Sequence, residues 1–176
     1  MLNETTRRVT TGFNEKKQSA ILADEQVQTF TPYDTLPSFH LQELFYTEDV
    51  HQALTTRHLQ KPYDINLPKG AFRFLKVRMP TKSEMIDDLK KAGQPIPTDW
   101  TTHNLHSTDS IDYVYILSGK ITCIVDGKQL HFSAGDFLVQ VGPEHTWIND
   151  HDEPCYALCI MIGLEPSGAI KKLSVD

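Results

Sequence analysis

The second half of the chain consists of short runs in which apolar residues dominate or alternate with polar ones. Such runs are typical of strands, because successive side chains of a strand point to opposite faces. Glycine-containing turns separate the runs, and Asp126-Gly127 in particular favours a tight hairpin. Short strands at fairly regular spacing predict an antiparallel sandwich or barrel. The expected strands cover residues 113–117, 121–125, 129–133, 137–141, 145–149 and 156–162.

The first half has a less regular pattern. Two strand-like runs flank the polar residues 14–18, so a hairpin is expected there. Residues 23–38 and 47–70 contain prolines and many polar residues, which favours irregular segments. The last strand of this half has basic and apolar side chains on both faces, so the pattern does not identify its inward face. The expected strands cover residues 7–11, 19–22, 39–46 and 71–79.

One helix is predicted between these two halves. Thr81 and Glu84 have the spacing of a capping box, in which the threonine hydroxyl and the glutamate carboxylate bond each other's backbone amides. Lys90 and Lys91 suit the negative end of the helix dipole, and Gly93 suits the C-terminal cap. The helix is therefore expected to be about three turns long.

Composition narrows the possible function. The chain has 176 residues, which is enough for one well-buried domain. Its net charge of -6 argues against nucleic acid as a partner, because phosphate binding requires a clustered basic surface. The absence of a membrane-spanning apolar run and of a signal-peptide pattern predicts a cytoplasmic protein that does not use a membrane. Three cysteines in apolar surroundings predict buried thiols rather than a disulfide framework.

The run ending at Asn149 has an unusual polar face. His145, Trp147 and Asn149 alternate, so in a strand their side chains point the same way. An imidazole, an indole and an amide on one face suit the wall of a pocket better than a plain core. Tyr113 and Tyr115 alternate with Asp112 in another strand, so they are expected on the opposite face from that carboxylate.

Two segments carry chemically useful side chains at fixed spacing. The first begins with His106, continues to Asp112, and has Gly119 seven residues after that aspartate. The second begins with Gly135-Asp136 and reaches His145 after a further glycine turn. These two segments resemble the two sequence motifs of the cupin superfamily.

The resemblance includes specific departures. Thr108 stands where the first cupin motif has its second histidine, and Asp112 stands where it has glutamate. In the second motif, Gln140 replaces a proline. A looser resemblance, through Arg7-Arg8-Val9 and the segments of both motifs, is to a subgroup of small, uncharacterised single-domain cupins.

The resemblance implies an all-β fold, a cupin-type double-stranded β-helix (jelly-roll barrel) with an N-terminal strand extension and one short helix. Residues 103–165 would be the cupin core. Residues 1–102 would supply the extension, the long loops and the helix, all within a single structural domain. Edge strands of such barrels need cover, so the N-terminal hairpin is a candidate for an exchanged arm and a homodimer is expected.

The resemblance also implies a site inside the barrel. His106, Asp112 and His145 would form a two-histidine, one-carboxylate set, which suits a mononuclear divalent metal. Fe2+ is favoured, and Zn, Mn or Ni is possible. The same three residues are the expected catalytic groups. Thr108, Gln140 and Trp147 are the expected substrate-binding residues.

Three functions are compatible with this site. The first is a metal-dependent enzyme of dioxygenase, decarboxylase or isomerase type acting on a small organic acid or aromatic compound. The second is a metal-free cupin in which His106 and Asp112 perform acid/base catalysis. The third is a non-catalytic protein that binds a small ligand. For each histidine the simpler alternative is a hydrogen-bonded core residue, and for Trp147 it is plain packing.

Overall fold

The structure is a computed structural model that describes residues 5–48 and 59–165. Within these residues it contains ten strands, one helix and three sheets. The largest sheet has five antiparallel strands in the order β3-β4-β10-β5-β8. Its strands are β3 (His40–Thr47), β4 (Phe72–Met79), β10 (Cys155–Gly163), β5 (Ser110–Ser118) and β8 (Phe137–Val141).

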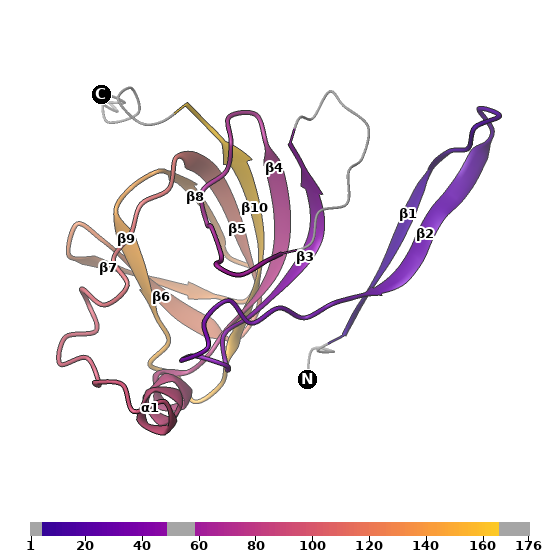
Figure 1. The fold of residues 1–176 in the computed structure, drawn as a ribbon. Helices are drawn as coiled ribbons and strands as arrows, with labels where there is room; N and C mark the ends of the chain where they lie inside the picture. Colours follow the sequence, from indigo (N-terminus) through magenta and orange to yellow (C-terminus); the bar gives the residue numbers. More distant parts are fainter. Residues whose placement is uncertain (1–4, 49–58, 166–176) are drawn as a thin grey trace, which may run out of the picture.

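A three-stranded sheet lies opposite the five-stranded one (Figure 1). Its strands, in spatial order, are β7 (Lys128–Ser133), β6 (Lys120–Val125) and β9 (His145–Ile148). The two sheets share a core, because Ile121 of β6 clusters with Val114 and Ile116 of β5. The fold is therefore all-β with one short helix, as the sequence predicts.

The strand periodicity explains which side chains enter this core. In β5, Asp112, Val114 and Ile116 are buried, whereas Tyr115 is 41% exposed. The predicted separation of Asp112 from the two tyrosines is confirmed by this alternation. All six strands predicted between residues 113 and 162 are present, and Asp126 and Gly127 adopt positive φ angles of 51° and 69°, as a tight turn requires.

Strand β4 has a charged residue on its inward face. Arg73 is buried, and its guanidinium lies 3.4 Å from the Glu43 carboxylate and over the rings of Tyr46 and Tyr63. Burial raises the pKa of Tyr63 to about 12, with the nearby Arg73 charge opposing that shift. This buried ion pair is the reason why hydrophobic alternation alone does not identify the inward face of β4.

The N-terminal hairpin forms a separate sheet. Strand β1 (Thr6–Phe13) pairs antiparallel with β2 (Ser19–Val27), and the hairpin extends away from both other sheets (Figure 1). The predicted hairpin is confirmed, but the prediction of irregular structure is wrong for residues 23–27, which continue β2. Cross-strand pairs such as Arg7–Asp24 stabilise this extension of β2. The hydrophobic pattern does not predict the extension, because its residues are mostly polar.

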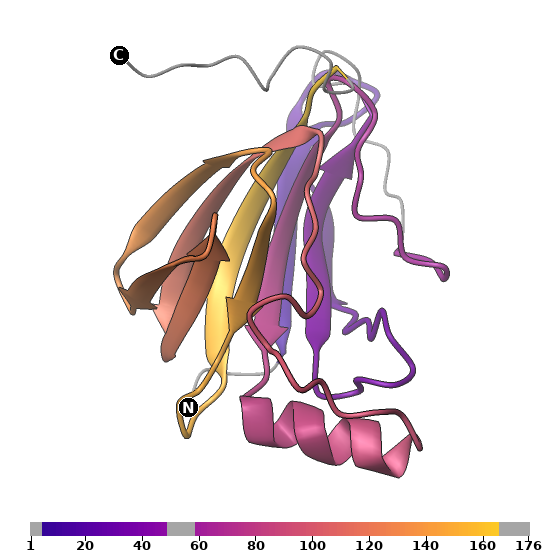
Figure 2. The same cartoon turned by 90° about the vertical axis from the view of Figure 1, so that its left-hand side faces the viewer.

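Helix α1 (Lys82–Lys91) lies at one end of the two larger sheets (Figure 2). The predicted capping box is present, since the Thr81 hydroxyl accepts from the Glu84 amide at 3.1 Å and the Glu84 carboxylate accepts from the Thr81 amide at 2.9 Å. Gly93 follows the helix with a φ of 66°. No helix among the described residues is long and apolar enough to cross a membrane.

The long connection between β3 and β4 is only partly described. Residues 59–70 contain no helix or strand, in agreement with the expected loop, and residues 49–58 lie outside the described part of the chain. Leu67, near the end of this connection, packs with Ala71 and Met161 in a second hydrophobic cluster. Residues 59–70 therefore cover the part of the interior that contains Arg73, whose guanidinium donates to the Asp64 carbonyl.

Candidate functional site

A backbone bridge brings the two motif histidines together. The His106 amide donates to the His145 carbonyl at 3.0 Å, and the His145 amide donates to the His106 carbonyl at 2.9 Å. Residues directly opposite in an antiparallel bridge point to the same side. The two imidazole ring centroids are 4.5 Å apart, with His145 buried and His106 half-buried.

A close backbone approach supports this bridge. Gly142 has a φ of 62°, and a Cβ at this position would lie 2.8 Å from the Thr108 carbonyl oxygen. Only glycine allows the turn before β9 to lie this close to the segment that carries His106. The glycine in the second motif therefore positions the first motif, which lies more than 30 residues earlier in the chain.

Both histidines have the same ring nitrogen engaged. His106 Nδ1 lies 2.7 Å from the Asn104 carbonyl oxygen, and His145 Nδ1 lies 2.9 Å from the Pro143 carbonyl oxygen. A carbonyl can only accept, so each Nδ1 carries the hydrogen. In the neutral imidazole each Nε2 then has a free lone pair, and both rings are fixed in orientation.

The electrostatics keep His145 neutral. Burial lowers the pKa of His145, the hydrogen bond to the Pro143 carbonyl partly offsets that effect, and the charge of His106 lowers the pKa further. A lowered pKa leaves the imidazole unprotonated at neutral pH. His145 is therefore available as a base or as a ligand through Nε2.

Asp112 belongs to a buried cluster of hydroxyl groups. The Ser110 hydroxyl lies 2.6 Å from Asp112 Oδ1, and the Thr108 hydroxyl lies 3.5 Å from Oδ2. Burial raises the pKa of Asp112, while the two hydroxyls and the charge of His106 lower it. The partner that a buried aspartate requires is thus supplied by two side chains from its own segment.

Of the three expected substrate-binding residues, Thr108 and Gln140 lie at this cluster, whereas Trp147 lies beside His145. Thr108 and Gln140 are buried, and Gln140 stands opposite Asp112 in the β5–β8 pairing. Trp147 is half-buried, and its ring meets that of His145 at 89° with 6.2 Å between centroids. Trp147 also packs against Phe132 of β7, so its side chain serves the core as well as the surroundings of His145.

Two cysteines also border the cluster, although the sequence pattern indicates only buried thiols. Cys123 Sγ lies 3.6 Å from Gln140 Nε2, and burial raises the pKa of this thiol to about 12. Burial also raises the pKa of Cys159, and the negative charge of Asp112 adds to that rise. Only the three-dimensional structure reveals these neighbours, because β10 pairs with β5, whereas Cys123 of β6 and Gln140 of β8 come from two different sheets.

The two histidines lie close together, but the three expected ligands do not form one group. Among residues 5–48 and 59–165, no group of three His, Cys, Asp or Glu side chains is arranged to hold a metal ion. The free Nε2 lone pairs of the histidines fit a divalent metal, and the Asp112 oxygens have hydroxyl neighbours. Asn149, by contrast, has a structural role, since its amide group donates to the Glu153 carbonyl at 2.9 Å and its oxygen accepts from the His151 amide.

Comparison with known proteins agrees with the cupin resemblance of the two sequence motifs. Residues 94–161 match the family model described as "Cupin domain". Over 92 residues the chain is 30% identical to "Phomopsin biosynthesis cluster protein C'" of Diaporthe leptostromiformis. That match covers 52% of this chain and 39% of the relative, so the chain matches about two fifths of the relative's length.

Solved structures with a similar fold are distant in sequence. The Schizosaccharomyces pombe Cnp3 cupin domain is 15% identical, with a TM-score of 0.44 and coverage of 92% of this chain and 85% of that one. A putative ethanolamine utilization protein Q from Salmonella typhimurium is 11% identical, with a TM-score of 0.44 and coverage of 93% and 100%. Ectoine synthase from P. lautus is 11% identical, with a TM-score of 0.43 and coverage of 72% and 65%.

Proposed function

We propose that the protein is an enzyme that acts on a small organic molecule at the His106–His145 pair. The observation that carries this proposal is the matched orientation of the two rings. Each Nδ1 is held by a backbone carbonyl, which leaves two Nε2 lone pairs on imidazoles whose centroids are 4.5 Å apart. In a plain core, an imidazole nitrogen left without a partner would be costly, and two histidines would not need to face one another.

A single divalent metal fits these two histidines. Metal-binding histidines are oriented by a hydrogen bond from the other ring nitrogen, and the Asn104 and Pro143 carbonyls accept such bonds here. His106 and His145 would hold the ion, with Fe2+ favoured over Zn, Mn or Ni. Asp112 is the third ligand that the sequence pattern predicts, but the described structure does not bring it into one ligand group with the two histidines. The ion would supply Lewis-acid or redox chemistry of the dioxygenase, decarboxylase or isomerase type.

The surrounding side chains define what the chain itself would do. Trp147 offers an aromatic surface beside His145, and the Gln140 amide and the Thr108 hydroxyl offer hydrogen bonds to a polar group. These features favour a small organic acid or an aromatic compound as the substrate. The one curated relative described above is named for a biosynthesis cluster, which is compatible with small-molecule chemistry.

The second candidate is metal-free acid/base catalysis by His106 and Asp112. One observation favours it, namely that the described residues contain no three-membered ligand group. The charge of His106 lowers the pKa of Asp112, and the His106 imidazole is half-buried and has a fixed ring orientation. In this case His106 would move a proton at Nε2, and Asp112 would favour the charged imidazolium.

Elemental analysis of protein purified without chelator distinguishes the two candidates. We expect close to one metal ion per chain in the wild type and in the His151→Ala control, which changes an exposed histidine of a polar loop. His106→Ala and His145→Ala should each reduce the metal content to less than about one tenth per chain, because loss of one imidazole removes a ligand. Metal retained in His145→Ala would overturn the metal-dependent proposal.

Turnover is tested next with the same variants. A panel of small acids and phenols is screened by thermal shift, and the compounds that bind are incubated with the protein and analysed for products. A metal-free wild type that still turns over a compound, and loses this activity in His106→Ala but not in His151→Ala, would support acid/base catalysis. Binding without any product would contradict both enzymatic candidates.

A further inference from the structure

A polar cavity lies outside the barrel interior, on the outer face of the five-stranded sheet. It has a volume of about 280 Å³, which is roughly the space that nine water molecules occupy. Two of its lining side chains carry a positive charge, and none is acidic. We call it the basic cavity, and its lining residues are Thr29, His40, Gln42, Lys76, Arg78 and Tyr156.

The register of three strands builds the floor of the basic cavity. His40 of β3 stands opposite Arg78 of β4, and Arg78 stands opposite Tyr156 of β10. Lys76 lies two residues before Arg78, so both basic side chains project from the same side of β4. Val77, between them, packs against the interior cluster, so their side is the outer one. Opposite residues of adjacent strands are about 5 Å apart, so one small ligand can contact several of these side chains.

The base of the N-terminal hairpin forms one wall of the basic cavity. Gln42 is 4% exposed, and its side chain accepts from the Thr6 hydroxyl at 2.7 Å and donates to the Thr29 hydroxyl at 3.2 Å. Lys76 Nζ donates to the same Thr6 hydroxyl at 3.1 Å. Side-chain hydrogen bonds therefore join this wall directly to the floor of the cavity.

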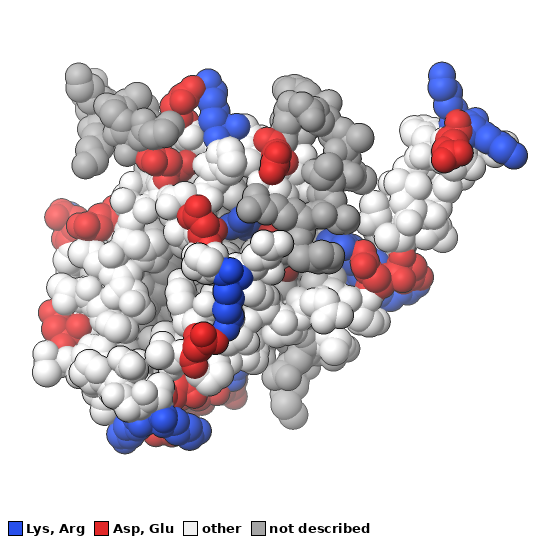
Figure 3. All heavy atoms as spheres, in the orientation of Figure 1, with Lys and Arg blue, Asp and Glu red and all other residues white. Residues whose placement is uncertain are grey.

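The charge of the basic cavity differs from that of the chain as a whole. The net charge of the chain is -6, and Figure 3 shows acidic side chains spread over the face that it displays. At the cavity, Lys76 and Arg78 carry two positive charges, and the Glu84 carboxylate, 2.7 Å from Arg78 Nη2, carries one negative charge. These three side chains together keep one positive charge, which favours an anion as the ligand.

Both basic side chains retain capacity for a ligand. Arg78 Nη1 donates to the Ser38 carbonyl at 2.7 Å and Nη2 donates to Glu84, which uses two of the five N–H groups of a guanidinium. The Lys76 ammonium lies 5.9 Å from the centre of the Tyr156 ring, and such a ring favours the positive charge without neutralising it. The Arg78 side chain is only 14% exposed, so its bonds to a ligand are weakly screened by water.

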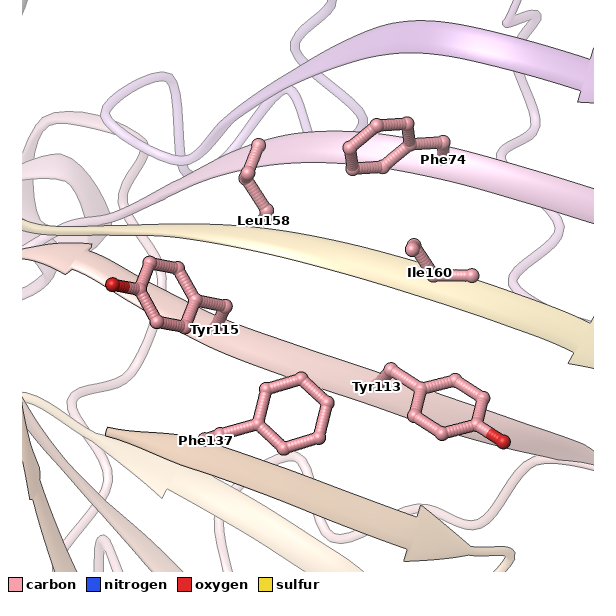
Figure 4. Close-up of a pocket in the computed structure, with 6 residues that line it drawn as sticks. All are labelled: Phe74, Tyr113, Tyr115, Phe137, Leu158 and Ile160. Atoms are coloured by element: carbon pink, nitrogen blue, oxygen red, sulfur yellow. The ribbon is translucent and has the colours of Figure 1, made fainter. Parts of the chain in front are cut away.

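The basic cavity ends where an apolar hollow begins on the same face of the sheet. Leu158 stands opposite Lys76 and, with Phe74 and the other residues labelled in Figure 4, lines that hollow. No charged side chain is among the residues that line the hollow. A charged group of the ligand would be poorly solvated there, so it is directed to Lys76 and Arg78.

We propose that the basic cavity binds a small anion that carries carboxylate or phosphate oxygens. Arg78 contacts the anion from the centre of its row, and His40 and Tyr156 offer hydrogen bonds from either side. Lys76 supplies a compact positive charge from the next row. The volume suits inorganic phosphate or a short carboxylic acid. This proposal is independent of the interior site, because the basic side chains lie on the opposite face of the sheet from it.

Isothermal titration calorimetry with the full-length protein tests this proposal. Inorganic phosphate and succinate are titrated separately up to about 10 mM, well above a Kd of about 1 mM. Lys76→Gln and Arg78→Gln each remove one positive charge from the basic cavity. Lys128→Gln is the matched control, because Lys128 is exposed on β7 in the other sheet. His145→Ala is a second control, because it changes only the interior site.

We expect the wild type to bind at least one of the two anions in a one-to-one ratio, with a Kd of about 1 mM or lower. Each cavity variant should raise this Kd about tenfold or more, because a charge-assisted hydrogen bond is lost. Lys128→Gln and His145→Ala should bind like the wild type. Binding of phosphate alone would assign the cavity to phosphate groups, and binding of succinate alone would assign it to carboxylates.

Circular dichroism, and light scattering for the mass in solution, should give the same values for the cavity variants as for the wild type. Lys76→Gln leaves the Arg78–Glu84 pair in place, so it tests the cavity even if Arg78→Gln unfolds the protein. The proposal would be overturned if neither anion bound the wild type, or if Lys76→Gln bound as tightly as the wild type. Loss of binding in His145→Ala alone would also overturn it, because the anion would then occupy the interior site.

Discussion

The two faces of strand β5 differ in the side chains they carry and in what surrounds those side chains. Its inner face places Asp112 in the interior, where buried hydroxyls from Thr108 and Ser110 surround the carboxylate. Its outer face presents Tyr113 and Tyr115 to the surroundings as part of an apolar hollow. A polar group inside is thus satisfied within its own segment, whereas apolar groups outside have no cover among the described residues of this chain.

The difference shows how one strand can serve two separate functions. Because side chains alternate, neighbouring positions in β5 face different surroundings and can vary independently of one another. The inner positions are constrained by packing and hydrogen bonding, while the outer ones, Tyr113 and Tyr115, line an apolar hollow. Substitutions on the two faces should therefore change different measured properties of the protein.

Removing bulk from the inner face should have the largest effect on stability. Ile116 is 1% exposed, so Ile116→Ala should lower the free energy of unfolding by about 2–5 kcal/mol through lost burial and a residual cavity. The matched outer change, Tyr115→Ala, should cost about 0.5 kcal/mol or less at protein concentrations where single chains predominate. Urea denaturation followed by fluorescence measures both, and equal losses would contradict the division between the faces.

Removing a hydrogen-bond donor from the inner cluster should have a smaller effect. Ser110 is 1% exposed and lies beside Asp112, so Ser110→Ala should cost about 1–3 kcal/mol by weakening the solvation of a buried carboxylate. Ser107→Ala is the control, because Ser107 is exposed in the same segment. The same urea experiment applies, and indistinguishable midpoints for the two variants would show that the hydroxyl does not support the carboxylate.

The smallest expected effect is a change in pH dependence. Burial raises the pKa of Asp112 above its ordinary value of 3.8, so the folded protein binds this proton more tightly than the unfolded chain does. Its contribution to stability is fully present below pH 3.8 and is lost as the pH rises through the raised folded pKa. Relative to Asp112→Asn, the wild type should therefore lose stability over this window.

Thermal unfolding of both proteins, in steps from the acid limit of folding to neutral pH, measures this difference. Glu144→Gln provides the control, since it removes one carboxylate from an exposed position next to His145. A constant difference between the wild type and Asp112→Asn across the range would mean that the pKa of this carboxyl is the same in the folded and unfolded states.

Most of the fold could be predicted from the sequence because the signals are local. Alternation identifies the strands from Ser110 to Gly163, and the capping residues Thr81 and Glu84 identify the helix. The extension of β2 to Val27 was missed, since its stability comes from pairing with β1 rather than from its own polar residues. The inward face of β4 was also hidden, because Arg73 occupies a position where alternation leads one to expect an apolar residue.

The candidate site could be predicted less completely. Spacing and resemblance identify His106, Asp112 and His145, but they contain no distances between segments that are far apart in sequence. The bridge that joins the two histidines and the carbonyls that fix their rings depend on how the loop before β5 meets β9. The nearness of Cys159 to Asp112 likewise depends on the β5–β10 register.

The backbone bridge between positions 106 and 145 does not depend on the identity of either side chain. Its two hydrogen bonds involve only amides and carbonyls, so most residue types at these positions would still face one another across the same gap. For protein engineering, the two positions are suited to paired substitution, because the residues placed there would face each other. New pairs of nucleophiles, acids or metal ligands can be screened there together while the rest of the barrel is kept unchanged.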